Sequence, residues 1–294
     1  MKKINLMKKI GFVLFTGAVF FGCKSAPVEN RVNPLDLLDG ESAIYFAIPT
    51  KADTELVSTI LKNNVDGISD SDVNTLLERV DIVYAGILHS KNQMIVQSAI
   101  SANIPSAYHA KIFSKKNGWT TSQYQTASSK SYNLYTNEGI TISLPDSNTI
   151  CLGRDINRML DTYDILRSEN TGVSGGNPNI DDIYYEHLLS ASNEVKFFAQ
   201  KPQSFLTLLT GANLDLKLIY VMGEIKVDPK NDKQYLLDLN FEFKNEKYVK
   251  PGKALLTLSF GLTDSDNVMI SPTNLQIKGI KIKKSQLFKL LTFK

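Results

Sequence analysis

The side chains that most often perform chemistry in proteins are few and scattered in this chain. The sequence of 294 residues contains two cysteines, Cys23 and Cys151, and three histidines, His89, His109 and His187. A zinc site gathers several such ligands, usually as closely spaced pairs, and a disulfide framework needs several cysteines. Neither pattern is present, so we expect no cofactor, no metal and no disulfide framework, and Cys151, in an apolar alternation, is predicted to be a buried core residue.

Ser174 lies in the segment GVSGG, which has the G-x-S-x-G spacing of some nucleophilic serines. This spacing is also similar to the GxSGG motif of serine proteases. Such a nucleophile needs an exposed, sharply turned position with a histidine and a carboxylate nearby. The flanking segments SENT and NPNIDD read as neither strand nor helix. A flexible linker explains these residues more simply, so we predict no catalytic residue and no enzyme.

Several acidic residues between positions 70 and 81 have nearly the spacing of a calcium-binding loop. The segment DSDVNTLLERVD contains Asp70, Asp72, Asn74 and Asp81, but Thr75 stands where such a loop requires glycine. Its apolar residues recur at helical spacing, and acidic residues in a first turn favour a helix through its dipole. The segment is therefore predicted to be a helix without a metal.

The N-terminus has the pattern of a secretory signal. Residues 1–9 carry four lysines and no acid, and residues 10–22 form an uncharged apolar run. A membrane-spanning helix needs about 20 apolar residues, so this run is too short to span the bilayer comfortably. A basic segment followed by a short apolar segment predicts a signal peptide over residues 1–22.

The end of the apolar run resembles the lipobox of bacterial lipoproteins, in which a small residue precedes the acylated cysteine. Gly22 and Cys23 match its last two positions, whereas Phe20 and Phe21 depart from it. A relaxed lipobox of this kind is similar to those of spirochaete lipoproteins. The resemblance implies lipidation of Cys23 by palmitate-like chains and anchoring in the cell envelope. The protein would then lie on the periplasmic face of the inner or outer membrane, or on the cell surface. The alternative is a simply cleaved signal peptide with Cys23 nearby by chance.

The composition of the chain excludes some classes of partner. Hydrophobic residues make up 43% and charged residues 21%, as in ordinary globular proteins, and the formal net charge is +3. Nucleic-acid binding needs a dense basic face with interleaved aromatic residues, which the body of the chain lacks. We therefore expect membrane lipid, and an envelope protein, as partners rather than nucleic acid.

The order of predicted elements repeats along the chain. AIYFAIP, a helix and the strands DIVYAGIL and QMIVQSAI are followed later by VKFFAQKP, a helix and the strands LKLIYVMGEIKV and QYLLDLNFEF. The fold class is therefore predicted as α+β, with two tandem diverged modules, each an antiparallel sheet with helices packed on one face. The predicted divisions are a signal peptide (1–22), a tether (23–40), a first module (41–166), a linker (167–182) and a second module (183–294).

Two further resemblances concern the body of the chain. The stretch ITISLPDSNTICLGRDINRML resembles repeated domains of bacterial envelope proteins whose function is unknown. The body also resembles spirochaete outer-membrane lipoproteins that insert amphipathic helices into the bilayer.

The C-terminal segment KGIKIKKSQLFKLLTFK contains six lysines and no acid. One interpretation is a basic amphipathic element that contacts an anionic membrane surface. The other, which the repeat favours, is the closing helix of the second module. The candidate membrane-contact residues are Lys281, Lys283, Lys284, Leu287, Phe288 and Leu291.

These patterns predict a lipid-anchored envelope protein that acts in binding, scaffolding or membrane association without catalysis. An alternative is a carrier that shelters a lipid or another apolar ligand, and a hydrolase of the envelope is a third possibility. The carrier hypothesis predicts an apolar cavity of ligand size with few polar groups inside it.

The predicted anchor can be tested on the mature protein. We expect mass spectrometry of the N-terminal peptide to show that the chain begins at Cys23 and carries acyl groups. Replacement of Cys23 by serine removes the thiol that is acylated, so the variant should lose the lipid mass and leave the membrane fraction. An unmodified N-terminal residue in the wild-type protein would overturn the assignment.

Overall fold

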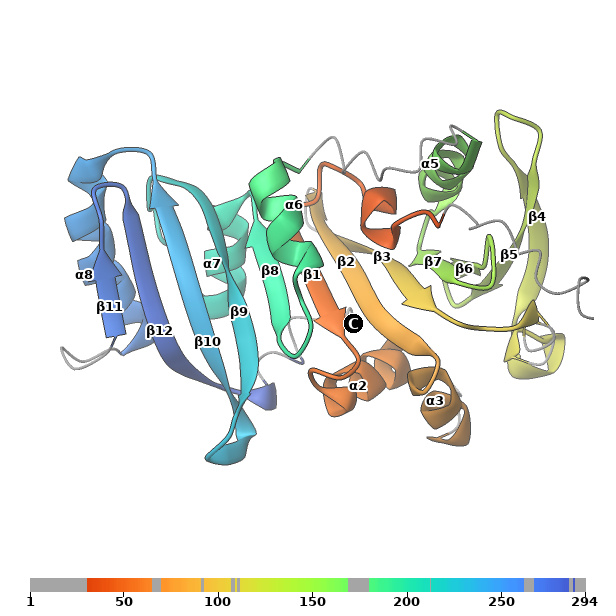
Figure 1. The fold of residues 1–294 in the computed structure, drawn as a ribbon, viewed down its shortest axis with the longest axis horizontal. Helices are drawn as coiled ribbons and strands as arrows, with labels where there is room; N and C mark the ends of the chain where they lie inside the picture. Colours follow the sequence, from red (N-terminus) through yellow and green to blue (C-terminus); the bar gives the residue numbers. More distant parts are fainter. Residues whose placement is uncertain are drawn as a thin grey trace, which may run out of the picture. The chain divides into compact units, whose positions relative to one another are not determined.

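A computed structural model describes residues 31–64, 70–90, 93–106, 109, 112–168, 180–211, 213–261, 267–285 and 288. Residues from Val32 onward form one compact unit. Its framework is a 12-stranded antiparallel sheet in the order β11-β12-β10-β9-β8-β1-β2-β3-β7-β6-β5-β4 (Figure 1). The mixture of a large antiparallel sheet with helices confirms the predicted α+β class.

The strands from the N-terminal part of the chain occupy one end of the sheet. They are β1 (Ile44–Pro49), β2 (Val80–Ser90), β3 (Gln93–Ala102), β4 (Thr120–Gln125), β5 (Ser131–Asn137), β6 (Ile140–Ser143) and β7 (Thr149–Gly153). The strands from the C-terminal part occupy the other end. They are β8 (Val195–Ala199), β9 (Leu218–Asp228), β10 (Asn231–Phe243), β11 (Asn267–Ile270) and β12 (Asn274–Lys283).

The N-terminal and C-terminal groups of strands meet where β1 pairs with β8. Phe46 lies opposite Phe197, and Tyr45 lies opposite Phe198. Because successive side chains of a strand point to opposite faces, these two pairs mark the two faces of the sheet. We call the face of Phe46 and Phe197 face A, and the face of Tyr45 and Phe198 face B.

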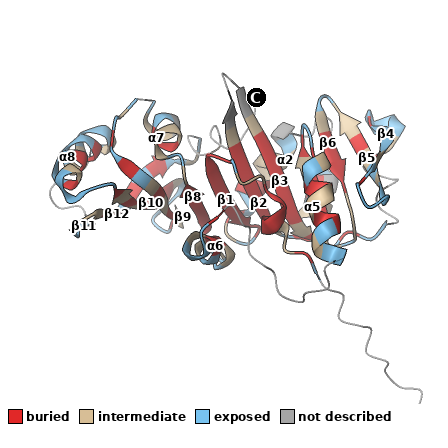
Figure 2. Cartoon of the chain, turned by 90° about the horizontal axis from the view of Figure 1, so that it is seen from above, coloured by how far each residue is buried: buried red, intermediate tan, exposed pale blue. Residues whose placement is uncertain are grey.

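Face A carries the larger apolar core. Buried side chains of α2 (Thr54–Asn64), α7 (Pro202–Thr210) and α8 (Val249–Phe260) join this core, and α3 (Asp70–Leu77) packs against it. The side chain of Asp53 caps α2 by accepting a hydrogen bond from the Leu56 amide at 3.0 Å. Figure 2 shows α7 and α8 on one side of the sheet and α6 on the other.

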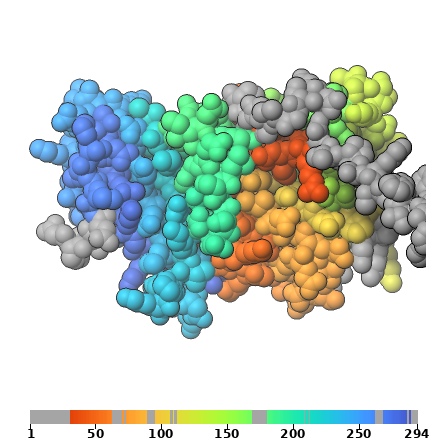
Figure 3. All heavy atoms as spheres, viewed as in Figure 1, coloured from red at the N-terminus to blue at the C-terminus, as the bar shows by residue number. Residues whose placement is uncertain are grey.

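Face B carries a second apolar core over the N-terminal strands. It contains buried side chains of the 3₁₀ helix η1 (Pro34–Leu37), α5 (Asn157–Ser168) and α6 (Asp182–Leu189). Space-filling atoms of α6, in green, lie over the boundary between the red-orange and cyan-blue parts of the chain (Figure 3). The expectation of helices on one face is therefore wrong for the first half, because β1, β2, β3 and β7 carry apolar residues on both faces.

Part of the segment expected as a tether, residues 23–40, belongs to the folded body. Val32, Leu35, Leu37 and Leu38 are buried in the core on face B. The Tyr185 hydroxyl donates a hydrogen bond to Asp36 at 2.7 Å, which joins η1 to α6. The three leucines between Asn33 and Asp39 are the sequence signal that this segment folds. Pro27 and Pro34 are instead typical of a linker.

Cys151 is confirmed as a core residue. Its side chain is buried on β7 among the residues of face B, and burial raises the pKa of its thiol. Such a thiol has little thiolate at neutral pH and is therefore unreactive.

A buried carboxylate fixes the β4–β5 hairpin to α5. Asp164 accepts hydrogen bonds from Thr126, at 2.8 Å, and from Ser128, and Lys130 pairs with it. Burial by itself would raise the pKa of Asp164, but these donors outweigh it and lower the pKa to about 2. The carboxylate therefore stays charged and holds the hairpin to the helix.

Two short 3₁₀ helices complete the described elements. They are η2 (Lys115–Asn117), which precedes β4, and η3 (Glu246–Tyr248), which leads into α8.

Glycine at position 252 allows α8 to approach the sheet. A Cβ atom there would overlap the ring of Phe243, which is buried on β10. We expect Gly252→Ala to destabilise the protein by about 1–3 kcal/mol, the usual cost of overpacking a filled core. Urea unfolding measures this loss. Ser259→Ala on the exposed side of the same helix is the control and should change stability by less than about 0.5 kcal/mol. Equal effects of both substitutions would contradict the close packing of α8.

Candidate functional site

The structure does not gather the predicted C-terminal membrane-contact residues on one surface. Lys281 and Lys283 are exposed on β12, and the residues between and before them, Ile280 and Ile282, are buried in the core on face A. Strand alternation therefore directs both lysines to face B. Phe288 packs partly buried against the core on face A, whereas Leu287 and Leu291 lie outside the residues with described side chains.

The ammonium group of Lys284 is engaged in contacts within the fold. Its ammonium group lies 2.7 Å from Glu55 and 3.4 Å from Asp53, and over the ring of Tyr235. Burial would lower the pKa of Lys284, but the hydrogen bond to Glu55 and the charge of Asp53 raise it overall. This lysine therefore fastens the end of β12 to the start of α2.

Asp53 is the centre of that contact. The hydroxyl of Tyr235 donates to its carboxylate at 2.6 Å, and both side chains are buried. Burial, followed by the hydrogen bond to Asp53, raises the pKa of Tyr235, so its hydroxyl remains a neutral donor. One carboxylate thus caps α2 and accepts from β10, which joins elements 182 positions apart in sequence.

The outer side of α8 combines apolar and basic residues. Leu258 is 80% exposed and Leu255 is 42% exposed, while Val249 and Leu256 on the inner side are buried. Lys247 in η3 and Lys250 in the first turn of α8 are also exposed. We call Lys247, Lys250, Leu255 and Leu258 the α8 surface. An apolar patch on a helix with a basic end is typical of an element that rests on a membrane or a partner.

The sequence analysis missed α8. Its segment KYVKPGKALLTLSFG contains Pro251 and Gly252, which usually argue against a helix interior. Pro251 lies in the first turn, where a missing N–H costs no hydrogen bond, and Gly252 is needed for packing. The sequence signal for this helix was the apolar run ALLTLSF. Its apolar residues are so closely spaced that some of them must face away from the core.

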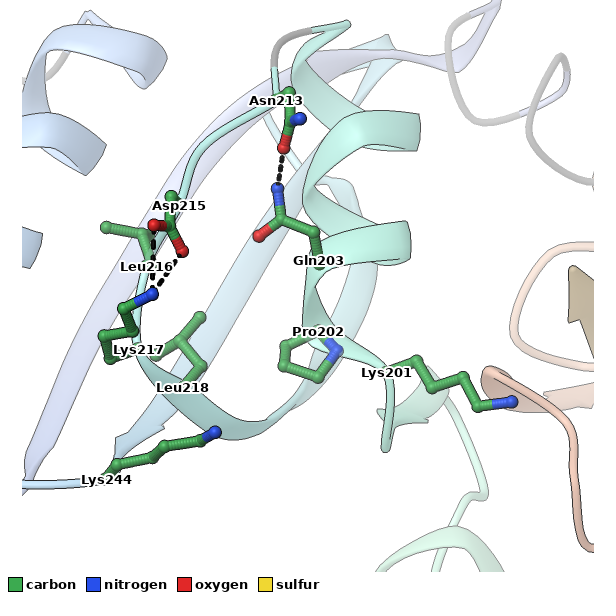
Figure 4. Close-up of a pocket in the computed structure, with 9 residues that line it drawn as sticks. All are labelled: Lys201, Pro202, Gln203, Asn213, Asp215, Leu216, Lys217, Leu218 and Lys244. Atoms are coloured by element: carbon green, nitrogen blue, oxygen red, sulfur yellow. Dashed lines mark hydrogen bonds and ion pairs between the residues drawn. The ribbon is translucent and has the colours of Figure 1, made fainter.

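A pocket of about 550 Å³ lies between the start of α7 and the strand ends of β9 and β10. Three lysines and one aspartate line it, together with polar and apolar neighbours (Lys201, Pro202, Gln203, Asn213, Asp215, Leu216, Lys217, Leu218 and Lys244; Figure 4). Its lining combines charged, polar and apolar residues, whereas the carrier hypothesis predicts an apolar cavity with few polar groups. Among the described residues no helix is long and apolar enough to cross a membrane, and no group of metal ligands forms a site.

Two further residues of the sequence-based hypotheses, besides Leu287 and Leu291, lie outside the described residues. These are Cys23, the predicted lipidation site, and Ser174 of the GVSGG segment. The predicted helix over residues 70–81 is present in part as α3, from Asp70 to Leu77, whereas Val80 and Asp81 already belong to β2.

Comparison with known proteins shows where this fold occurs. The family model described as outer membrane-associated lipoprotein TP0453 matches residues 29–288. Outer membrane protein TP0453 of Treponema pallidum (strain Nichols) is 23% identical over 141 residues, which is 48% of this chain and 46% of that protein. The sequence alignment thus spans about half the length of that curated relative.

Solved structures of TP0453 share the fold. Crystal form I has a TM-score of 0.66 at 19% identity and covers 89% of this chain and 97% of that one. Crystal form III has a TM-score of 0.65 at 19% identity, with 89% and 98% covered.

The contact between Asp53 and Tyr235 should contribute measurably to stability. We expect Tyr235→Phe to destabilise the protein by about 1–3 kcal/mol, because it leaves a buried carboxylate short of a donor. Chemical unfolding of the purified protein measures the change. Glu55→Gln removes only the exposed partner of Lys284 and should cost less than about 1 kcal/mol. A larger loss for Glu55→Gln than for Tyr235→Phe would refute the central role of Asp53.

Proposed function

Because the chain belongs to the family of the outer membrane-associated lipoprotein TP0453, it is a membrane-anchored lipoprotein of the cell envelope, and we propose that its folded body also contacts the membrane. The proposed covalent anchor is Cys23, through the acyl chains that its lipobox-like context implies. Two or more acyl chains hold a protein stably at a bilayer, whereas one holds it only marginally. A second contact from the body would fix how the protein lies on the surface.

The α8 surface supports this second contact. Leu258 is 80% exposed in the last turn of α8, which leaves most of its apolar area in water. Transfer of a leucine side chain from water to an apolar phase stabilises by about 1.5–3 kcal/mol. Lys247 and Lys250 would lie near the headgroups, where each basic residue adds about 1 kcal/mol on an anionic membrane.

The C-terminal residues are a separate candidate for membrane contact. Lys281 and Lys283 point to face B, whereas α8 lies on face A, so the two groups do not form one surface. Lys284 is already paired with Glu55 and Asp53. We therefore place the first membrane contact at α8 and keep Lys281 and Lys283 as a second one.

We propose a role in binding, scaffolding or membrane association without catalysis. Several buried tyrosines with raised pKa values in the described residues donate hydrogen bonds to carboxylates inside the fold, as Tyr235 does to Asp53 and Tyr163 does to Asp146. These contacts join elements of the structure and are accounted for without a reaction. An envelope protein remains the proposed partner, through surfaces that the membrane leaves open.

The order of strands supports the proposal that the chain contains two diverged copies of one module. Outward from the β1–β8 pair, both halves continue with a long antiparallel hairpin, β2–β3 in one and β9–β10 in the other. In each half, the next strand in the sheet, β7 or β12, pairs with the second strand of that hairpin. α2 and α7 follow the first strand of each half and pack on face A.

The proposed membrane contact predicts that binding survives without the lipid anchor. A protein that starts at Lys24 keeps the compact unit from Val32 onward and should bind vesicles of phosphatidylcholine with phosphatidylglycerol. Replacing Leu258 by serine should weaken sedimentation with these vesicles by about tenfold or more, because the apolar transfer is lost.

Ile183→Ser is the matched control for this experiment. Ile183 is 70% exposed on α6, on the opposite side of the sheet, so its replacement should leave vesicle binding unchanged. If the protein stays wholly in solution with these vesicles, or if both substitutions weaken binding equally, α8 is not the contact.

A further inference from the structure

The pocket at the start of α7 is a basic cavity that neither the anchor nor the α8 surface uses. Lys201, Lys217 and Lys244 line it against a single acidic residue, Asp215. Its volume of about 550 Å³ is within the usual range of pockets that bind small molecules. The chemistry of its lining therefore favours an anion of small-molecule size.

The three lysines differ in how strongly they are engaged. Lys201 donates to the Glu41 carbonyl at 3.2 Å, and its side chain points away from the other lining residues (Figure 4). Lys217 pairs with Asp215 at 2.9 Å, but both side chains are largely exposed, and ion pairs in water are weak. Among the described residues no hydrogen bond or ion pair of the Lys244 ammonium is found. Lys244 and Lys217 can therefore both turn to a bound anion.

The backbone around the pocket adds to its positive potential. The cavity opens at the start of α7, whose first turn carries no acidic residue and begins with Pro202. The positive end of a helix dipole favours a negatively charged ligand. The amide of Lys244 is hydrogen-bonded to the Lys217 carbonyl at 2.8 Å, so the start of β9 and the end of β10, beside these two lysines, are held together.

We propose that this pocket binds a phosphate group, held by Lys244 and Lys217 at the start of α7. Two sources supply this chemistry, the headgroup of an anionic phospholipid and a soluble phosphate compound. Lys244 is followed closely by η3 and α8, so a lipid bound here would lie beside the basic end of the α8 surface. The lipid source rests on the proposed membrane contact, whereas the phosphate site itself does not.

Nuclear magnetic resonance of the protein that starts at Lys24 tests the site directly. We expect inorganic phosphate to shift the amide signals of Gln203, Ser204 and Lys217 in a saturable way, and Lys244→Gln to weaken this binding by about fivefold or more. Lys233→Gln removes the same charge from an exposed site at the opposite end of β10 and should leave the shifts unchanged. Absence of saturable shifts with inorganic phosphate and with soluble short-chain phosphatidylglycerol would overturn the site. Equal weakening by both substitutions would overturn it as well.

The source of the phosphate is decided by comparing the two probes. Tighter binding of short-chain phosphatidylglycerol than of glycerophosphoglycerol, its deacylated form, would identify a lipid headgroup, because both carry the same phosphodiester charge. Equal or weaker binding of the lipid would identify a soluble phosphate compound. Leu258→Ser separates this proposal from the membrane contact, since it should reduce vesicle binding and leave the phosphate shifts intact.

Discussion

The antiparallel pairing of β1 with β8 is the constraint on which the rest of the structure depends. Three residue pairs join the two halves of the chain, Tyr45 with Phe198, Phe46 with Phe197 and Ala47 with Lys196. Their alternation places a continuous row of residues on each face, so that Phe46, Phe197 and Leu239 belong to one core while Tyr45 and Phe198 belong to the other. A shift of one residue in this register would exchange the two faces along the whole junction.

Close packing around this sheet requires particular small and polar residues. A Cβ atom at Gly223 would overlap the Asp238 carbonyl on β10 and crowd the ring of Phe197 on β8. Asp53 connects α2 to β10 and, through Lys284, to the end of β12. Burial of a carboxylate is costly unless donors surround it, and here a backbone amide, a hydroxyl and an ammonium group do so. These contacts bind the two halves together on face A, beyond the strand pairing itself.

Two surface features outside the two cores, the α8 surface and the pocket at the start of α7, differ in the chemistry of their side chains. The α8 surface offers exposed leucines beside lysines, which suits the boundary between headgroups and acyl chains. The pocket at the start of α7 offers ammonium groups beside a mixed polar and apolar lining. The lipid anchor proposed at Cys23 would keep both close to a bilayer, and the high local concentration makes even weak contacts effective. Membrane association by the folded body and by the anchor are thus complementary.

Local patterns in the sequence determined much of this protein. Alternating apolar residues predicted the strands of the β2–β3 and β9–β10 hairpins, and helical spacing predicted α3. The sequence also indicated the envelope location, because a short apolar run that ends at Cys23 is a local signal. Only the tertiary structure decided that the two halves share one sheet, since the partner of β1 lies about 150 positions away and any edge strand would offer similar hydrogen bonds. Likewise, the exposure of Leu258, the pairing of Lys284 with Asp53 and the gathering of Lys201, Lys217 and Lys244 depend on which face each element presents, and that is determined by packing between distant segments.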